Sequence, residues 1–266
     1  MNWHREMEVA RAAAAAGGDI VSRYFREGIV LESKQDEGWN LVSKADVESE
    51  RAIVETIRAA FPDHEILGEE EASADTGAEH VWVVDPLDGT NNFAHGIPHF
   101  AVSIGYRHRG EPTVGVIFNP VTGDWYTAAR GEGAFHGERR AEVAKATRLD
   151  EVFVGVGFFY DRGAMMQATL DAIRDLFHEK IHGVRRFGTA SLDLVHVGLG
   201  RFGAYFEYEL QPWDFAAGEL FVTEAGGRIT TCRGEAMPIT KTSVLASNGP
   251  LHDAVLAIVE PHLGAS

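Results

Sequence analysis

Cysteine is almost missing from this chain, which has only Cys232 among its 266 residues. A single thiol cannot form an intrachain disulfide, so we expect a reducing, cytoplasmic setting. Residues typical of a thiol-based catalyst do not surround Cys232, and we therefore interpret it as a buried packing residue.

Positive charge is also scarce, because 24 Lys and Arg residues stand against 40 Asp and Glu, for a formal net charge of −16. A surface this acidic repels phosphate backbones and anionic lipid headgroups. We therefore expect neither nucleic acid nor a membrane among the partners. Long apolar segments are lacking too: the alanine run at residues 12–16 is far too short to span a bilayer, and we expect no signal peptide.

Helical spacing of apolar residues predicts two helices at the start of the chain, over residues 6–25 and 46–61. In the second helix, three glutamates are predicted to face outward, namely Glu48, Glu50 and Glu55. The polar, glycine-containing stretch between the helices, residues 33–40, is predicted to form an exposed loop.

Short apolar runs separated by turn residues follow the second helix. They predict strands over residues 66–68, 81–84, 101–106, 113–118 and 125–128. Because turn residues join the last three runs closely, we predict an antiparallel meander there.

The pattern changes near residue 150, where strands and helices begin to alternate. The predicted strands cover residues 152–157, 184–187, 202–207, 228–231 and 244–246, and the predicted helices cover residues 164–177, 191–197, 215–224 and 252–259. No linker composition marks the change. We therefore predict two subdomains in one compact unit: an α+β part over residues 1–145 and an α/β part over residues 146–266.

Acidic side chains gather at three element boundaries: in residues 68–71 after a short strand, in residues 85–90 after a buried strand, and at Asp214, where a helix opens. A strand that ends in an acid places a carboxylate at a sheet edge, where sites commonly form. Each segment alone also fits an ordinary structural role, namely a solvated loop, a surface turn and a helix N-cap. Together they favour one acidic site.

The middle segment combines several useful groups. Pro86 stiffens the turn, so Asp85 and Asp88 can aim at one point. Gly89 lets an anion approach backbone N–H groups, and Thr90 adds a hydroxyl. Acidic oxygens beside exposed N–H donors make a place where a metal ion and a phosphate can meet.

Histidine is the competing type of metal ligand. His95 and His99 are four residues apart, but Gly96 and Pro98 lie between them, which argues against a zinc-binding helix. A ligand set made of carboxylates alone points to a hard cation, Mg²⁺, with Mn²⁺ as the alternative.

Three segments resemble the signatures of the inositol monophosphatase family: residues 68–70, 82–93 and 213–227. They lie in the family's order, and the similarity extends over nearly the whole chain. The resemblance implies a layered α-β-α-β-α sandwich of the inositol monophosphatase and fructose-1,6-bisphosphatase type. It also implies a homodimer, sensitivity to lithium and two to three Mg²⁺ ions in each active site.

The resemblance further implies roles for particular residues. The metal ligands would be Glu69, Asp85, the carbonyl of Leu87, Asp88 and Asp214. The catalytic residues near the attacking water would be Glu69, Thr90 and Asp46. The substrate would be bound by Gly89, Thr90, Gly188, Thr189, Ala190, Glu207 and Asp214, although Glu207 alone also fits an outward-facing strand residue. A mobile loop containing Lys34 would close over the metals, and Glu71, where many members have Ser, adds negative charge nearby.

The implied activity is hydrolysis of inositol monophosphate to inositol and phosphate by a metal-activated water. The segment at residues 186–191 resembles the one that contacts the inositol ring. Histidinol-phosphate phosphatases usually have Asp in place of Thr189, and 3′,5′-bisphosphate nucleotidases have a Lys that this segment lacks. Fructose-1,6-bisphosphatase activity would need a second cationic pocket, for which Arg185, Arg186 and Lys241 are candidates. A regulatory protein that binds RNA polymerase is the alternative of a different class.

Overall fold

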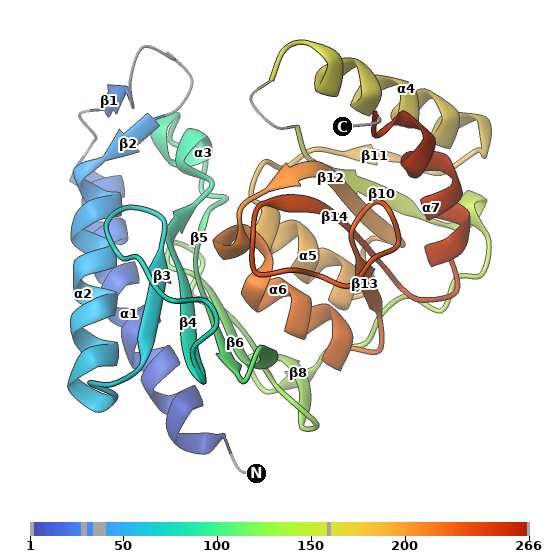
Figure 1. Cartoon of the computed structure of the whole chain (residues 1–266). Coiled ribbons are helices and arrows are strands. Elements are labelled where there is room, and N and C mark those ends of the chain that lie inside the picture. The colour runs from blue at the N-terminus through green and yellow to red at the C-terminus, as the bar shows by residue number, and fades with distance from the viewer. Residues whose placement is uncertain (1–2, 28–30, 34–40, 159–160, 265–266) are drawn as a thin grey trace.

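The computed structural model describes residues 3–27, 31–33, 41–158 and 161–264, with only the backbone described at 31–33 and 41–43. Lys34 and nearly all of its predicted loop lie outside the described residues. Five layers, in which helices alternate with sheets, follow one another from left to right in Figure 1. The predicted α-β-α-β-α sandwich is confirmed.

The first layer is a pair of helices, α1 (His4–Glu27) and α2 (Lys44–Ala60), close to the predicted bounds. Their apolar faces pack on one side of a seven-stranded sheet, and the core there includes Ala10, Ala13, Ala14, Ile53, Ile57 and Trp82. Two short strands that we did not predict, β1 (Leu31–Ser33) and β2 (Leu41–Ser43), pair with each other before α2.

The seven-stranded sheet has the order β3-β4-β5-β6-β7-β8-β9. Its strands are β3 (Glu65–Gly68), β4 (His80–Asp88), β5 (Ala101–His108), β6 (Glu111–Asn119), β7 (Asp124–Ala129), β8 (Gly133–His136) and β9 (Arg139–Arg140). Strand β3 runs parallel to β4, and the following neighbours are antiparallel. The predicted meander is therefore confirmed, and it continues through β8 and β9.

A five-stranded sheet with the order β11-β10-β12-β14-β13 forms the fourth layer. Its strands are β10 (Phe153–Val156), β11 (Gly183–Arg185), β12 (Ala204–Leu210), β13 (Arg228–Thr230) and β14 (Thr242–Ser247). The outer layer holds α4 (Ala164–His178) and α7 (His252–Val259), with 3₁₀ turns at Leu149–Glu151 and Glu260–His262. Side chains alternate along β12, because Phe206 packs in the cluster under α4 and α7 while Tyr205 faces the opposite side.

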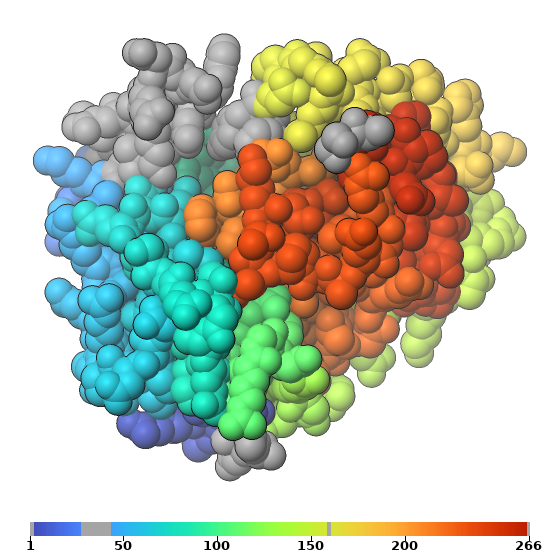
Figure 2. All heavy atoms as spheres, viewed as in Figure 1, coloured from blue at the N-terminus to red at the C-terminus, as the bar shows by residue number. Residues whose placement is uncertain are grey.

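The central layer consists of α5 (Ala190–Gly198) and α6 (Pro212–Glu224), which pack against both sheets. The first sheet is built from residues 65–140 and the second from residues 153–247. Figure 2 shows these two halves side by side, blue to green against orange to red. The predicted subdomain border between residues 145 and 146 falls between the sheets and stays a prediction, since both sheets share one helical layer.

The prediction that a turn follows residue 84 was wrong. Strand β4 continues to Asp88, and its register with β5 shifts between Asp85 and Asp88, which marks a bulge. A short helix that we did not predict, α3 (Thr90–Ala94), begins immediately afterwards. Among the described residues, no helix combines the length and apolar character needed to cross a membrane.

Helix α6 approaches the first sheet through two strand glycines. A Cβ added to Gly115 would lie 2.7 Å from the Ala217 carbonyl oxygen, and one added to Gly105 would lie 2.8 Å from the Ala216 Cβ. Both distances are shorter than van der Waals contact, so only glycine lets the helix come this close. Because Asp214 belongs to α6, these glycines also set the height of its carboxylate above the sheet.

We predict that Gly115→Ala destabilises the fold, because the added methyl group would strike the backbone of α6. Overpacking of this kind costs about 1–3 kcal/mol, and each kcal/mol lowers the melting temperature by about 2–4 °C in a chain of this size class. Thermal unfolding measures the effect, with Glu111→Ala at the exposed start of the same strand as control. An unchanged melting temperature in Gly115→Ala would contradict this account of the packing.

Candidate active site

Three aspartates meet where the two halves of the chain come together. Asp85 and Asp88 lie at the end of β4 and Asp214 in the first turn of α6, and one oxygen from each lies within 4.8 Å of the other two. Asp85 and Asp88 are 1% and 8% exposed. The structure thus brings together three of the predicted metal ligands from positions far apart in the sequence.

Backbone N–H groups hold each of these carboxylates in place. The N–H of Leu87 donates to Asp85 Oδ1 at 2.9 Å, across the bulge. The N–H of Gln211 donates to Asp214 Oδ2 at 2.7 Å, so Asp214 closes the first turn of α6 and does not occupy the N-cap position that we considered.

Asp88 is bound by the first turn of α5. The N–H groups of Ala190 and Ser191 donate to its two oxygens at 3.2 and 2.7 Å. The positive end of a helix stabilises a negative charge at this position. Ala190, a predicted substrate contact, is thus placed beside a metal-ligand candidate, and its N–H is used in holding that carboxylate.

A second acidic group lies beside the first. Asp46 of α2 and Glu69 and Glu70, which follow β3, place one oxygen each within 4.8 Å of one another. The Thr90 hydroxyl lies 3.4 Å from Asp46 Oδ1 and 3.1 Å from the Leu87 carbonyl oxygen, and both are acceptors. Glu70 was not among the predicted ligands.

Glu50 supports the acidic loop from behind, and the prediction that it faces outward was wrong. Its side chain is 1% exposed. Its two oxygens accept the backbone N–H groups of Glu70, Glu71 and Ala72 at 2.7 to 2.8 Å. Three charge-assisted hydrogen bonds to consecutive residues fix the path of the loop that carries Glu69. Glu71 points elsewhere, because it forms an exposed ion pair with Arg51.

Crowding and burial make these carboxylates costly to ionise without a cation. Burial, followed by the charges of Glu69, Asp88 and Asp214, raises the pKa of Asp85 well above its usual range. Burial and the neighbouring carboxylates raise the pKa of Asp214 in the same way, and burial raises the pKa of Asp88 to about 6. A divalent cation would relieve this repulsion, and ligands that are all oxygen suit a hard one.

Gly89 lies directly beside the aspartates in the left-handed conformation, with a φ of 96°. A Cβ at this position would lie 2.4 Å from Thr189 Oγ1, so a side chain is excluded on steric grounds as well. Thr189 is 1% exposed, and its hydroxyl donates to the His99 carbonyl oxygen at 2.8 Å. Asn92 Nδ2 donates to the carbonyl oxygens of His99 and Phe187, both at 2.8 Å.

These contacts lock the segment before α5 against the end of β4. Gly188 also has a positive φ, 80°, and a Cβ there would meet the Arg186 guanidinium at 2.5 Å. The predicted substrate contacts at residues 188–190 therefore lie at the site, where Thr189 and Ala190 bind other parts of the protein.

Two further buried carboxylates lie next to the aspartates. Glu207 is 8% exposed and accepts a hydrogen bond from the Tyr205 hydroxyl at 2.7 Å, which excludes an outward-facing position. Asp193 of α5 is 1% exposed, and neither of its oxygens has a hydrogen-bond partner in the part of the chain that the structure describes. Burial raises the pKa of Glu207 to about 7 and that of Asp193 well above its usual range, and the charge of Arg186 opposes both shifts.

The three cations considered for a second anion pocket do not act together. The charge of Arg186 lowers the pKa of Glu207 and that of Asp193, so Arg186 faces the site. Lys241 instead forms an ion pair with Glu209. The Arg185 guanidinium lies over the ring of Phe153, 4.2 Å from its centre.

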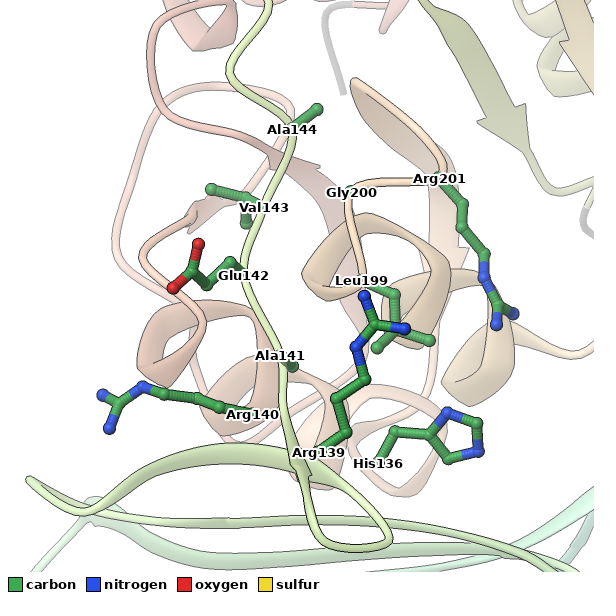
Figure 3. Close-up of a pocket in the computed structure, with 10 residues that line it drawn as sticks. All are labelled: His136, Arg139, Arg140, Ala141, Glu142, Val143, Ala144, Leu199, Gly200 and Arg201. Carbon is green, nitrogen blue, oxygen red and sulfur yellow. The ribbon is translucent and has the colours of Figure 1, made fainter.

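A different hollow is lined by several arginines, of which Arg139 and Arg201 lie on one side in Figure 3 while Arg140 points away from them. It encloses about 630 Å³, and its lining includes Arg139, Arg140 and Arg201. Leu199 and Gly200 line it just past the last residue of α5, whereas Asp88 is bound at the first turn of that helix. A helix of nine residues is about 13 Å long. This hollow is therefore separate from the candidate active site.

We predict that Glu50→Gln weakens the binding of divalent cations, because an amide NH₂ group would face backbone N–H donors and release the loop that carries Glu69. Hydrogen bonds to charged groups contribute about 1.5–3 kcal/mol, so affinity should fall about 10-fold or more. Calorimetric titration measures it, with Glu55→Gln on the exposed face of the same helix as control. Equal affinities in the two variants would show that the loop is held by other contacts.

Comparison with known proteins agrees with this geometry. A model of the inositol monophosphatase family matches residues 2–263. The inositol-1-monophosphatase of Caulobacter vibrioides is 40% identical, over 94% of this chain and 97% of its own length. The Nus factor SuhB of Pseudomonas aeruginosa is 37% identical, over 98% of this chain and 97% of its own. The crystal structure of extragenic suppressor protein suhB from Bartonella henselae has a TM-score of 0.88 at 36% identity, covering 96% of this chain and 98% of that one. The chain belongs to the inositol monophosphatase family.

Proposed function

We propose that this chain is a Mg²⁺-dependent phosphomonoesterase that hydrolyses inositol monophosphate to inositol and phosphate. Membership of the family, and a relative named inositol-1-monophosphatase, support a phosphatase activity. The observation that carries the proposal is the meeting of Asp85, Asp88 and Asp214 within 4.8 Å. The proposal extends to a lithium-sensitive homodimer that works in the cytoplasm, as the family resemblance implies.

The residues present fit the metal that the proposal requires. The buried carboxylates lie close together, and burial and mutual repulsion raise the pKa values of Asp85 and Asp214. A cation bound between their oxygens would offset this repulsion. The ligands would be Glu69, Asp85, the Leu87 carbonyl, Asp88 and Asp214. When bound, Mg²⁺ would polarise the phosphate ester and lower the pKa of a bound water.

The chain's own residues position the reactants. The Thr90 hydroxyl, 3.4 Å from Asp46 Oδ1, can orient a water for in-line attack, and Asp46 can accept its proton. Gly89 leaves room for phosphate oxygens to approach the backbone, since no side chain fits there. No Ser or Cys nucleophile is required.

A polyol is favoured as the leaving group by the buried carboxylates beside the metal ligands. Asp193 has two oxygens without hydrogen-bond partners among the described residues, and Glu207 binds the Tyr205 hydroxyl through Oε2. Hydroxyl groups of a ring can donate to Glu207, which keeps 8% of its surface exposed, whereas the Asp193 oxygens are fully buried and add negative charge nearby rather than a direct contact. A second phosphate would instead require cations, and of the three candidates only Arg186 acts on this part of the site. This favours a monophosphate over fructose 1,6-bisphosphate.

We predict that Asp88→Asn lowers kcat by about 100-fold or more, the scale seen when one electrostatic group of an active site is removed. The assay compares inositol 1-phosphate, fructose 1,6-bisphosphate, histidinol phosphate and adenosine 3′,5′-bisphosphate by kcat/KM. Asp63→Asn, an exposed carboxylate in the turn that follows α2, serves as the matched control. Undiminished turnover in Asp88→Asn would contradict the assignment of Asp88 as a metal ligand. A higher kcat/KM for another ester of the panel would identify that ester as the better substrate.

We also predict that removal of divalent cations with a chelator abolishes both hydrolysis and substrate binding. The site then holds several negative charges that repel a phosphate, and Mg²⁺ reverses this repulsion. Calorimetry with inositol 1-phosphate measures binding before and after Mg²⁺ is restored. Tight binding by the metal-free protein would contradict the proposed role of the carboxylates.

One observation favours a second function. The relative from P. aeruginosa, 37% identical over nearly the whole chain, is named a Nus factor. A regulatory role that involves RNA polymerase is therefore a second candidate. Failure to hydrolyse every ester of the panel, together with binding to purified RNA polymerase, would favour this role over the enzyme.

A further inference from the structure

A second group of side chains of the types that ligate metals lies at the opposite end of β4 from the aspartates. His80 begins this strand, Glu79 precedes it, and His108 ends β5 directly opposite, because the register pairs His80 with His108. One ligand atom from each residue lies within 4.8 Å of the other two. His80 is five positions before Asp85, and a strand rises about 3.3 Å per residue, so the two groups are about 17 Å apart.

Contacts behind His80 fix the orientation of its ring. His80 Nδ1 lies 2.6 Å from the hydroxyl of Tyr106, which is 1% exposed. The ring of His64 stacks on it with centres 4.2 Å apart and planes 4° from parallel. His64 is itself held, because the Trp82 Nε1–H donates to its Nδ1 at 3.1 Å. Metal-binding histidines typically use their second ring nitrogen in this way, which leaves Nε2 for the metal.

The other two residues are already drawn together. His108 Nε2 lies 3.3 Å from Glu79 Oε1, and the Arg109 guanidinium donates to the same oxygen at 2.9 Å. The Glu79 side chain is 51% exposed and that of His108 is 14% exposed. The group is therefore rigid on the protein side and open on the other, where a water can complete a coordination shell.

The donor atoms of this group differ from those of the active site. Two imidazole nitrogens and one carboxylate suit a borderline-soft ion such as Zn²⁺, whereas oxygen donors alone suit Mg²⁺. An exposed ion pair by itself would contribute little and would not need two aligned histidines.

We propose that Glu79, His80 and His108 form a Zn²⁺ site, distinct from the Mg²⁺ site, with water in the fourth position. The ion joins the first residue of β4 to the last residue of β5. The ring of Trp3, before the start of α1, lies 5.3 Å from that of His108. Zinc therefore ties the sheet at the place where the N-terminal segment packs on it.

Calorimetric titration of the full chain with ZnCl₂, in excess Mg²⁺, tests the proposal. We expect one zinc site, weakened about 10-fold or more in both His80→Gln and His108→Gln, and unchanged in His178→Gln, an exposed histidine of α4. Asp88→Asn should keep this site, which separates it from the proposed active site. Zinc binding that survives both histidine variants, or that is lost in Asp88→Asn alone, would overturn the proposal.

Cobalt gives an independent readout of the ligands. Co²⁺ bound by two histidines and a carboxylate in a four-coordinate site absorbs visible light more strongly than octahedral Co²⁺ bound by oxygens. We expect this absorption in Asp88→Asn and its loss in the Asp88→Asn, His108→Gln double variant, with melting temperatures that show both are folded. If folded Asp88→Asn lacked the strong absorption, the proposal that Glu79, His80 and His108 form a four-coordinate metal site would be wrong.

Discussion

Repulsion among buried carboxylates is the constraint on which this structure depends. One oxygen from each of Asp85, Asp88 and Asp214 lies within 4.8 Å of the other two. Burial increases the free energy needed to keep these carboxylates ionised. Such a cluster persists only if the chain forces it together. A bulge in β4, the first turn of α5 and the first turn of α6 each supply backbone N–H donors that do so. A divalent cation would relieve this repulsion, so the cluster is suited to hold one.

The support extends well beyond the residues that would touch the metal. Glu50 reaches from α2 to bind three consecutive N–H groups of the acidic loop, and Asn92 joins the end of β4 to the segment before α5. These polar contacts are buried, so each would be costly to leave unmade. The site is therefore a property of both halves of the chain, and neither half contains it alone.

Local sequence patterns were sufficient for most of the longer helices and strands, and for the aspartates, which lie near the boundary of a helix or strand. The residues that were missed depend on contacts between distant segments. Glu50 lies three positions from Val47 and from Ile53, so helical spacing places it on the apolar face, and that signal could have corrected its predicted exposure. Asp193 is a charged residue in a short helix of mainly apolar residues, and this pattern likewise indicates that it is buried. The bulge between Asp85 and Asp88 and the pairing of His80 with His108 needed the sheet register.

The two glycines beneath α6 have a consequence for ion size. Asp214 belongs to helix α6, which can approach the sheet closely because Gly105 and Gly115 have no side chains. Asp85 and Asp88 belong to strand β4 of the sheet itself. The span between the two sets of oxygens is therefore determined by two positions that carry no side chain. Ions of different radius prefer different oxygen spans, and Mg²⁺ tolerates less variation than Ca²⁺. If the site binds a divalent cation as proposed, its preference among cations would depend in part on strand residues that never contact the ion.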